Sequence, residues 1–194
     1  MTSRQYTEQE IIQGCRRGKR RFQELLYRLY FGFGMSVCLR YSYNREDAIE
    51  ILNDGFMKVF NNIGIYDESK PFRTWFRKIL VNTAIDHYRA NRENRLRITA
   101  YDTADEIDEA RKTAGLHDTE ITAGTEAILA LFDRLPENYR MIFNLYEIEG
   151  YNHDEIAGML GISPGTSRSA LSRAKTIIRA LYNKNIKDNR HEAV

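Results

Sequence analysis

The sequence predicts an all-α protein in which a flexible acidic linker joins two small helical domains. Apolar residues recur at spacings of three and four in several stretches, as in helices that bury one face. Residues that cap helices, such as Thr7, Asn44 and Asn152, precede these stretches. Charge is segregated along the chain, since residues 1–97 hold 18 Lys or Arg against 11 Asp or Glu, and residues 98–134 hold 3 against 9. The expected boundaries are 6–95 for the first domain, 96–123 for the linker and 124–185 for the second domain.

Two helices are expected at the start of the first domain. Thr7 and Glu10 form a capping box, which should begin a short helix that carries Ile11 and Ile12. A longer helix should follow, with a continuous apolar face made of Phe22, Leu25, Leu26, Leu29, Tyr30, Phe33 and Val37. The basic cluster at residues 16–21 lies between the two helices. It is either a solvated helix junction, which is the preferred interpretation, or a contact to nucleic acid.

The third expected helix is capped by Asn44 and has Asp47 near the positive end of its dipole. Its inward residues are predicted to be Ile49, Leu52, Phe56, Val59 and Phe60. Its outer face is mainly acidic and consists of Glu46, Asp47, Glu50, Asn53, Asp54 and Lys58. Acidic groups repel phosphate, so this face suits a basic protein partner, although simple solvation explains the spacing equally well.

A loop that contains Tyr66 precedes the last helix of this domain, which should start near Pro71 and run toward Arg95. Aromatic residues alternate there with cations, namely Phe72, Trp75 and Phe76 with Arg73, Arg77, Lys78, Arg89 and Arg92. Single-stranded nucleic acid needs a flat ring for a base and a cation for the backbone. Any amphipathic helix with a basic exterior shows the same pattern, and Trp75 by itself is more often a core residue.

The middle of the chain separates this domain from the next. Residues 96–125 combine acidic residues with Gly115 and Gly124 and few large apolar side chains, which predicts a flexible linker. Beyond it, Ala127, Ile128, Leu131 and Phe132 predict one helix face. Pro136 should then start a helix that continues through Ile148. These two helices should supply the core of the second domain.

The clearest functional pattern is a helix, a glycine turn and a second, basic helix. Asn152 and Glu155 form a capping box, and Gly161 can adopt the left-handed conformation that ends a helix. Ser163 should cap a helix that begins at Pro164. Such a pair can place the first turns of its second helix in the major groove of DNA. The donors near that end are Thr166, Ser167, Arg168, Ser169 and Ser172. An ordinary helical hairpin with a solvated basic face is the alternative.

Composition excludes other classes. No run approaches the roughly 18 to 20 apolar residues of a membrane span, and the first residues lead into no secretory apolar core, so a soluble, cytoplasmic protein is expected. Cys15 and Cys38 accompany neither a CxxC pair nor a histidine cluster, which predicts core residues and no metal site. Asp86 and His87 are adjacent and point about 100° apart on a helix, so an enzyme that acts on nucleic acid is not favoured.

Taken together, these residues resemble bacterial RNA polymerase sigma factors of the extracytoplasmic-function class. The resemblance covers nearly the whole chain, the first domain as sigma region 2 and the second as sigma region 4. In the first domain it is carried by Glu46-Asp47-Ala48, Asn53-Asp54-Gly55-Phe56-Met57-Lys58-Val59-Phe60, Phe72-Arg73-Thr74-Trp75-Phe76 and Asn82-Thr83-Ala84-Ile85-Asp86. In the second domain it is carried by Leu135-Pro136, Asp154-Glu155-Ile156-Ala157, Gly165-Thr166-Ser167-Arg168-Ser169 and Ser172-Arg173-Ala174-Lys175.

The resemblance implies three functional surfaces. The helix at 45–61 would dock on the clamp helices of the largest polymerase subunit through Asp47, Glu50, Asn53, Asp54 and Lys58. The loop at 66–71 and the helix after it would capture a flipped base of the promoter minus-ten element through Tyr66, Ser69, Lys70, Phe72, Trp75, Lys78 and Asn82. The helix from Pro164 would read the minus-thirty-five element through Thr166, Arg168, Ser169, Ser172, Arg173 and Lys175.

The resemblance also implies partners. These are core RNA polymerase, including the flap of its second-largest subunit, promoter DNA, and an anti-sigma factor. Ser167-Arg168-Ser169 resembles the subgroup whose anti-sigma factors are membrane-bound, while this chain itself would not insert into the membrane. No catalytic residue, cofactor or metal is expected. The competing hypothesis is a helix-turn-helix regulator that binds DNA without polymerase, but such regulators usually dimerise, and the chain lacks coiled-coil heptads.

Overall fold

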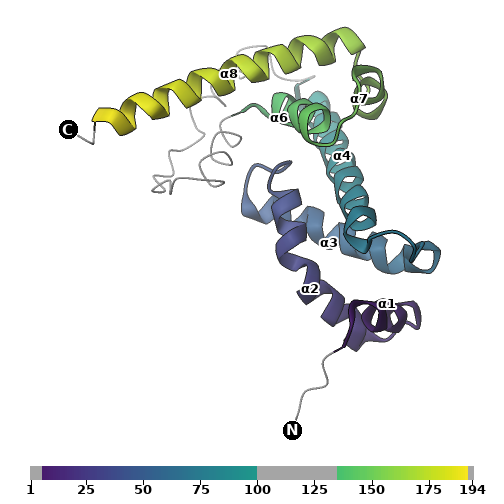
Figure 1. Ribbon diagram of the computed structural model, residues 1–194. Helices are drawn as coiled ribbons and strands as arrows, with labels where there is room; N and C mark the ends of the chain where they lie inside the picture. Colours follow the sequence, from purple (N-terminus) through teal and green to yellow (C-terminus); the bar gives the residue numbers. More distant parts are fainter. Residues whose placement is uncertain (1–5, 100–134, 192–194) are drawn as a thin grey trace. The chain divides into compact units, whose positions relative to one another are not determined.

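The computed structural model describes residues 6–99 and 135–191, with side chains described at 6–91 and 135–183 (Figure 1). Every regular element in these ranges is helical, so the all-α prediction is confirmed. The chain divides into two compact units, Met1–His87 and Tyr88–Val194, and the division falls inside helix α4 (Phe72–Thr99). The helix expected around residues 127–132 and most of the expected linker lie outside the described residues, so the three domain boundaries stay a prediction.

The first unit begins with two helices joined by a tight turn. In α1 (Glu8–Arg16) the capping box forms as predicted, with the Glu10 amide 3.2 Å from the Thr7 hydroxyl and the Thr7 amide 2.9 Å from the Glu10 carboxylate. The turn then brings the Lys19 amide to the Gly14 carbonyl at 3.2 Å. Helix α2 (Arg20–Cys38) starts directly after it. The basic residues of the turn are therefore placed beside the end of α1.

The next elements lead to the loop at residues 66–71. Helix α3 (Arg45–Asn62) is capped as predicted, since Asn44 Oδ1 accepts the Asp47 amide at 2.7 Å. A single 3₁₀ turn, η1 (Ile63–Ile65), ends this helix, and α4 starts at Phe72. None of the helices in the described ranges has an apolar stretch sufficient to cross a bilayer.

Aromatic side chains form the core between α2, α3 and α4. The Phe76 ring is fully buried and has its centroid 4.7 Å from that of Phe56 and 5.9 Å from that of Tyr30. Helices α2 and α3 approach closely at Gly34, where an added Cβ would lie 2.3 Å from Leu52 Cδ1. Rings of this size bury a large apolar area each, so this cluster accounts for much of the stability of the first unit.

The predicted helix faces differ from the buried faces at particular positions. On α2, Leu26, Tyr30 and Val37 are buried as expected, but Leu29 is 53% exposed. On α3, Leu52, Phe56 and Val59 are buried as expected, while Ile49 and Phe60 are only half-buried and Ala48 and Ile51 lie in the core. The buried face of α3 is therefore rotated slightly from the predicted face, because both α2 and α4 pack against this helix.

The second unit contains a helical core built around the start of α8. Its described elements after α4 are α6 (Glu137–Phe143), η2 (Asn144–Ile148), α7 (His153–Leu160) and α8 (Pro164–His191). Leu135, Ile142, Leu145, Ile156 and Leu160 are buried there, and Leu171 and Ala174 cover them from α8. This packing leaves the opposite face of the first turns of α8 exposed.

The helix predicted from Pro136 through Ile148 is not continuous as an α-helix. Residues 144–148 form a π turn, in which the Glu149 amide binds the Asn144 carbonyl five residues earlier at 3.0 Å. The buried Asn144 side chain donates to the Arg140 carbonyl at 3.0 Å. This side-chain donor competes for a carbonyl of the helical ladder and accompanies the widened turn. Apolar periodicity cannot reveal such a change, because π and α turns differ by one residue in their hydrogen bonding.

Candidate nucleic-acid interface

The junction of α7 and α8 has the geometry predicted for a helix-turn-helix. Asn152 Oδ1 accepts the Glu155 amide at 2.9 Å, and the Glu155 carboxylate accepts the Asn152 amide at 2.8 Å. Gly161 adopts φ 62° and ψ 43°, the left-handed conformation that glycine takes without steric cost. Ser163 Oγ then accepts the Thr166 amide at 3.0 Å, so its side chain caps α8. Local sequence therefore determines the turn.

A buried hydrogen bond orients α8 on α7. The Ser167 hydroxyl is fully buried and lies 2.9 Å from His153 Nδ1, across fourteen residues of sequence. The His153 ring stacks on Tyr146 with centroids 4.6 Å apart. Because Ser167 points into the unit, it cannot contact DNA, and its sequence neighbours are turned outward.

The opposite face of α8 presents the predicted contact residues to solvent. Thr166, Arg168, Ser169, Ser172 and Arg173 are all exposed. The Ser169 hydroxyl donates to the Thr166 carbonyl at 3.0 Å, and Arg173 Nη1 lies 3.4 Å from the Tyr139 hydroxyl. Arg168 has no ion pair among residues 6–91 and 135–183, which leaves its five donors available.

Lys175 lies at the edge of this exposed row. Its ammonium forms an ion pair with Glu147 at 2.6 Å and lies 5.9 Å from the centre of the Tyr146 ring. The side chain is half-buried, unlike the other five predicted residues of α8. Lys175 could thus contact a phosphate only if its ion pair with Glu147 broke.

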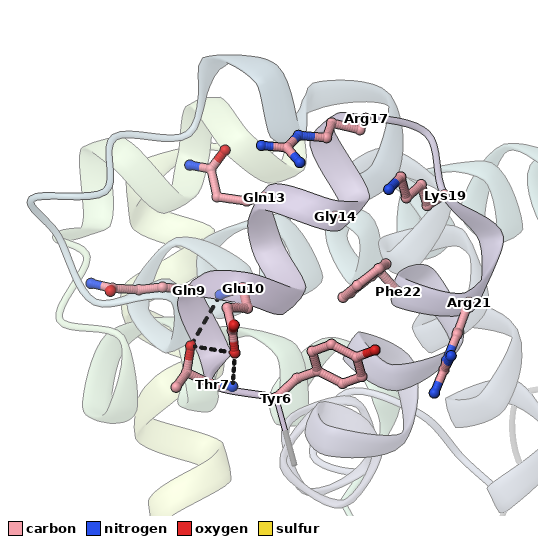
Figure 2. A pocket seen from close by; sticks show the side chains of 10 residues that line it. All are labelled: Tyr6, Thr7, Gln9, Glu10, Gln13, Gly14, Arg17, Lys19, Arg21 and Phe22. Carbon is pink, nitrogen blue, oxygen red and sulfur yellow. Dashed lines mark hydrogen bonds between the residues drawn. The ribbon is translucent and has the colours of Figure 1, made fainter. Parts of the chain in front are cut away.

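The loop between η1 and α4 is held in place by Arg16 at the end of α1. Arg16 Nε donates to the Ile63 carbonyl at 3.1 Å, and its two terminal nitrogens bind the Tyr66 carbonyl and the Glu68 carboxylate. Gln13 Nε2 also donates to Glu68, at 2.6 Å. The preferred interpretation of the basic cluster as a solvated junction is therefore wrong for Arg16, because its guanidinium donates to three acceptors of a loop about fifty residues away. The other four cations of the cluster are exposed, and three of them line the pocket in Figure 2.

Two of the predicted minus-ten residues lie in the interior. Tyr66 is 6% exposed and Phe72 is 1% exposed, with ring centroids 5.4 Å apart. The Tyr66 hydroxyl donates to the Lys70 carbonyl, and burial raises the pKa of this phenol. Neither ring offers a surface to a base in this conformation. Their position is explained by packing against Tyr30 and Trp75, which the sequence pattern does not reveal.

The exposed part of the loop is organised around Asp67. Its carboxylate accepts the Ser69 hydroxyl at 2.8 Å and the Ser69 amide at 3.0 Å, and the Lys70 ammonium is 3.9 Å away. The hydrogen bond from the Ser69 hydroxyl, and then that from the Ser69 amide, lower the pKa of Asp67. The Asp67 carboxylate therefore stays ionised. Ser69 and Lys70 are both exposed.

Helix α4 adds a polar row beside this loop. Trp75, Lys78 and Asn82 are spaced by three and four residues, which places them on one side of the helix. Trp75 is half-buried against Tyr66, with ring centroids 5.0 Å apart, whereas Lys78 and Asn82 are exposed. The structure thus brings the loop and the first turns of α4 together, with one half-exposed ring and four exposed polar side chains.

The predicted polymerase-binding residues lie along α3. Glu50, Asn53 and Asp54 are exposed, and Asp47 and Lys58 are half-buried. Several already have partners within the unit. Asp54 lies 2.8 Å from His87 Nε2, Lys58 lies 2.8 Å from Asp86, and Asn53 accepts the Tyr27 hydroxyl at 3.1 Å.

One exposed residue on this face was missed by the sequence prediction. Met57 is 59% exposed and stands three and seven residues after Asp54 and Glu50, so it shares their side of α3. The helical spacing of the acidic residues is the signal that identifies it. A flexible apolar side chain among polar ones is a feature of protein-docking surfaces. Arg16, the other missed residue, has no local signal.

Comparison with known proteins gives matches to two family models, one toward each end of the chain. The family model described as "Sigma-70 region 2" matches residues 26–94. The model described as "Sigma-70, region 4" matches residues 125–178. Between them the two matches cover well over half of the chain, and they appear in the order expected from the motifs.

Two sequence relatives, described first below, agree with these matches. An RNA polymerase sigma-H factor from Pseudomonas aeruginosa is 28% identical over 183 residues, which are 90% of this chain and 93% of that protein. An ECF RNA polymerase sigma factor, SigM, from Bacillus subtilis is 26% identical over 164 residues, 84% of this chain and 96% of that protein. A solved structure of the sigma factor RpoE with the anti-sigma factor NepR, from Bartonella quintana, is 17% identical with a TM-score of 0.48, covering 82% of this chain and 96% of that one.

Proposed function

Because this chain belongs to the sigma-70 family, as a sigma factor of the extracytoplasmic-function class that acts in transcription initiation, we propose a contact to promoter DNA or polymerase for each surface described above. The observation that carries the proposal is the exposed row on α8, with Ser167 on the opposite side of the helix anchored to His153. This row supports recognition of the minus-thirty-five element in the major groove by Thr166, Arg168, Ser169, Ser172 and Arg173. Lys175 would contribute a phosphate contact only after it leaves Glu147.

The minus-ten element is proposed to bind at the loop and the first turns of α4. Ser69, Lys70, Trp75, Lys78 and Asn82 combine one half-exposed ring with polar and cationic side chains, as capture of an unstacked base requires. Tyr66 and Phe72 take a different role in this proposal. Their burial supports a function in holding the loop against α4 rather than direct contact with DNA.

Core polymerase is proposed to bind the outer face of α3. Glu50, Asn53, Asp54 and Met57 would contact the clamp helices of the largest subunit, with Asp47 and Lys58 at the margins. The acidic side chains would attract a basic partner, and Met57 would supply apolar contact area. The second unit would contact the flap of the second-largest subunit.

The remaining partners follow from the family resemblance. We propose that an anti-sigma factor sequesters this chain in the cytoplasm, and the resemblance at Ser167-Arg168-Ser169 favours one that is anchored in a membrane. The protein would catalyse no reaction itself and would need no cofactor. A polymerase-independent regulator is less consistent with the two family matches. Such a regulator would have no role for the segment that matches sigma-70 region 2.

Transcription from a library of random promoters tests the proposal directly. Bacterial core polymerase would be assayed with and without the full-length chain, and the transcripts would be sequenced. We expect transcripts that start only when the chain is present, downstream of a shared two-part element. If no such transcripts arise while the chain alone binds a specific duplex, it acts as an independent regulator and the proposal is wrong.

A further inference from the structure

Two consecutive residues of the π turn η2, Tyr146 and Glu147, are connected to α8 at two separate points. The Glu147 carboxylate lies 2.6 Å from the Lys175 ammonium, which is also 5.9 Å from the centre of the Tyr146 ring. The same ring stacks on His153, with the ring planes 23° apart, and His153 Nδ1 lies 2.9 Å from the Ser167 hydroxyl. One short turn is therefore linked to α8 at Ser167, through His153, and directly at Lys175.

These two points enclose most of the segment that is proposed to read DNA. Ser167 is in the first turn of α8, and Lys175 follows eight residues later, or about 12 Å along the helix axis. Residues 168–173 lie between them. A helix that is attached at one point can still tilt and rotate about that point, whereas a second attachment restricts both movements. Base contacts depend on such restriction, because hydrogen bonds weaken steeply when donor and acceptor are misaligned.

The place of Lys175 on the helix separates it from the reading face. At about 100° per residue, Lys175 lies about 60° around the helix from Ser172 and about 120° from Ser169. Its side chain is 41% exposed and that of Glu147 is 34% exposed, so the ion pair is partly shielded from solvent. An ion pair of this kind holds two elements together better than a fully solvated pair does.

We propose that the ion pair between Glu147 and Lys175 persists when α8 enters the major groove, and that Glu147 is a positioning residue for recognition of the minus-thirty-five element. Of the two roles open to Lys175, it then has the structural one and contacts no phosphate. The π turn gains a function as well, because it carries both Tyr146 and Glu147, and such turns are frequent at functional sites. The inference rests on the proposed function, since it takes residues 166–173 as the DNA-reading segment.

The test compares binding to two fluorescent promoter duplexes. They share the minus-ten element found in the promoter library and differ only in whether the minus-thirty-five element is intact or scrambled. Holoenzyme made with the full-length chain would be titrated at several salt concentrations, with anisotropy as the readout. The variants are E147Q, K175Q and the charge swap E147K/K175E. The control is E24Q, which removes an ion pair of equal length, 2.6 Å between Glu24 and Arg28, in the first unit.

We expect E147Q and K175Q each to lower the ratio of the two affinities about fivefold, near the upper limit for a partly exposed ion pair. The slope of affinity against salt should stay unchanged, whereas loss of one phosphate contact would lower it by about 0.9. The charge swap should restore the ratio to within about twofold of the wild type, as coupled residues do in a double-mutant cycle. E24Q should match the wild type, and all variants should bind core polymerase normally.

Several results would overturn the inference. If E147Q binds both duplexes more tightly and with a slope steeper by about 0.9, Glu147 competes with DNA for Lys175 and does not position the helix. If K175Q lowers the slope by that amount, Lys175 contacts a phosphate. The inference is also wrong if E147Q keeps the wild-type ratio, or if the charge swap discriminates no better than the single variants.

Failure of the premise would look different. If the wild-type holoenzyme binds the intact and the scrambled duplex equally well, the proposed minus-thirty-five function itself has failed.

Discussion

Arg16, the last residue of α1, forms an ion pair with Glu68 in the loop that precedes α4, and it also binds the Ile63 and Tyr66 carbonyls. One guanidinium thereby connects the first helix to the proposed minus-ten loop. Its planar fork can donate to all three acceptors together, which a lysine ammonium cannot do with the same geometry. The loop conformation therefore depends on Arg16, a residue for which no contact with DNA or polymerase is proposed.

Arg16→Gln should loosen this loop. We expect a decrease of about 1–3 kcal/mol in the free energy of unfolding, since carbonyl and carboxylate acceptors lose a charged donor. Binding of the minus-ten strand should weaken while core polymerase binding persists. Chemical denaturation and anisotropy would measure the two effects, with exposed Arg20→Gln as the control. Equal behaviour of the two variants would show that Arg16 does not position the loop.

Gly34→Ala and Gly32→Ala should have opposite effects on stability within one helix. A Cβ at Gly34 would meet Leu52 Cδ1 at 2.3 Å and the Phe76 ring at 3.4 Å, so we expect a loss of about 1–3 kcal/mol from overpacking. A Cβ at Gly32 would meet nothing within 4 Å, and alanine should stabilise α2 by about 0.5–1 kcal/mol. Thermal unfolding would distinguish them, and a stabilised Gly34→Ala would contradict the packing described.

Arg168→Ala should cause loss of most minus-thirty-five recognition with polymerase binding retained. Loss of one bidentate base contact costs about 1–3 kcal/mol, or roughly fivefold to 150-fold in affinity for the duplex. Arg179→Ala is the matched control, because Arg179 is also exposed on α8 but lies about 16 Å further along the helix. Transcription from promoters with and without the upstream element is the readout. Unchanged transcription at every such promoter would remove Arg168 from the interface.

Asn82→Ala should impair promoter opening and spare upstream recognition. Asn82 is exposed on the α4 row beside Lys78, where its amide can both donate to and accept from the edge of an unstacked base. Permanganate reactivity of thymines near the start site would report opening, and retardation of a minus-thirty-five duplex would serve as the internal control. Normal opening by the variant would place the base-capture site elsewhere.

Cys15 and Cys38 should resist alkylation in the folded protein. Burial raises the pKa of Cys15 to about 11 and that of Cys38 to about 12, because the thiolate loses solvation. Since the thiolate is the reactive form, modification by iodoacetamide at pH 8 should be about a hundredfold slower or more than in denaturant, where the pKa is about 8.5. Mass spectrometry over time would show it. Rapid modification of either native thiol would contradict the burial.

Contacts between near neighbours could be predicted from the sequence. The capping boxes at Thr7 with Glu10 and at Asn152 with Glu155, the cap at Asn44 and the left-handed Gly161 all involve atoms within one turn of chain. Their geometry depends on backbone angles and hydrogen bonds that form locally. The all-α class and the helix-turn-helix were predictable for the same reason.

Burial and long-range pairing could not be predicted in this way. Periodicity marks Leu29 as a core residue, yet it is half exposed. The family resemblance implies that Tyr66 and Phe72 contact a base, yet both rings are interior. Both outcomes depend on which helix covers which side of another. The same limit applies to the π turn after Phe143, because apolar spacing does not distinguish it from an α turn.

The sequence by itself determined where most helices begin, the helix-turn-helix with its Gly161 turn, and the family to which the motifs belong, because these follow from spacings of three to seven residues. Only the tertiary structure decided that Arg16 holds a loop about fifty residues away and that Gln13 donates to the same loop. It also decided that Ser167 is buried against His153. Such contacts have no periodic signature, since their partners lie on different helices or loops that are distant in sequence.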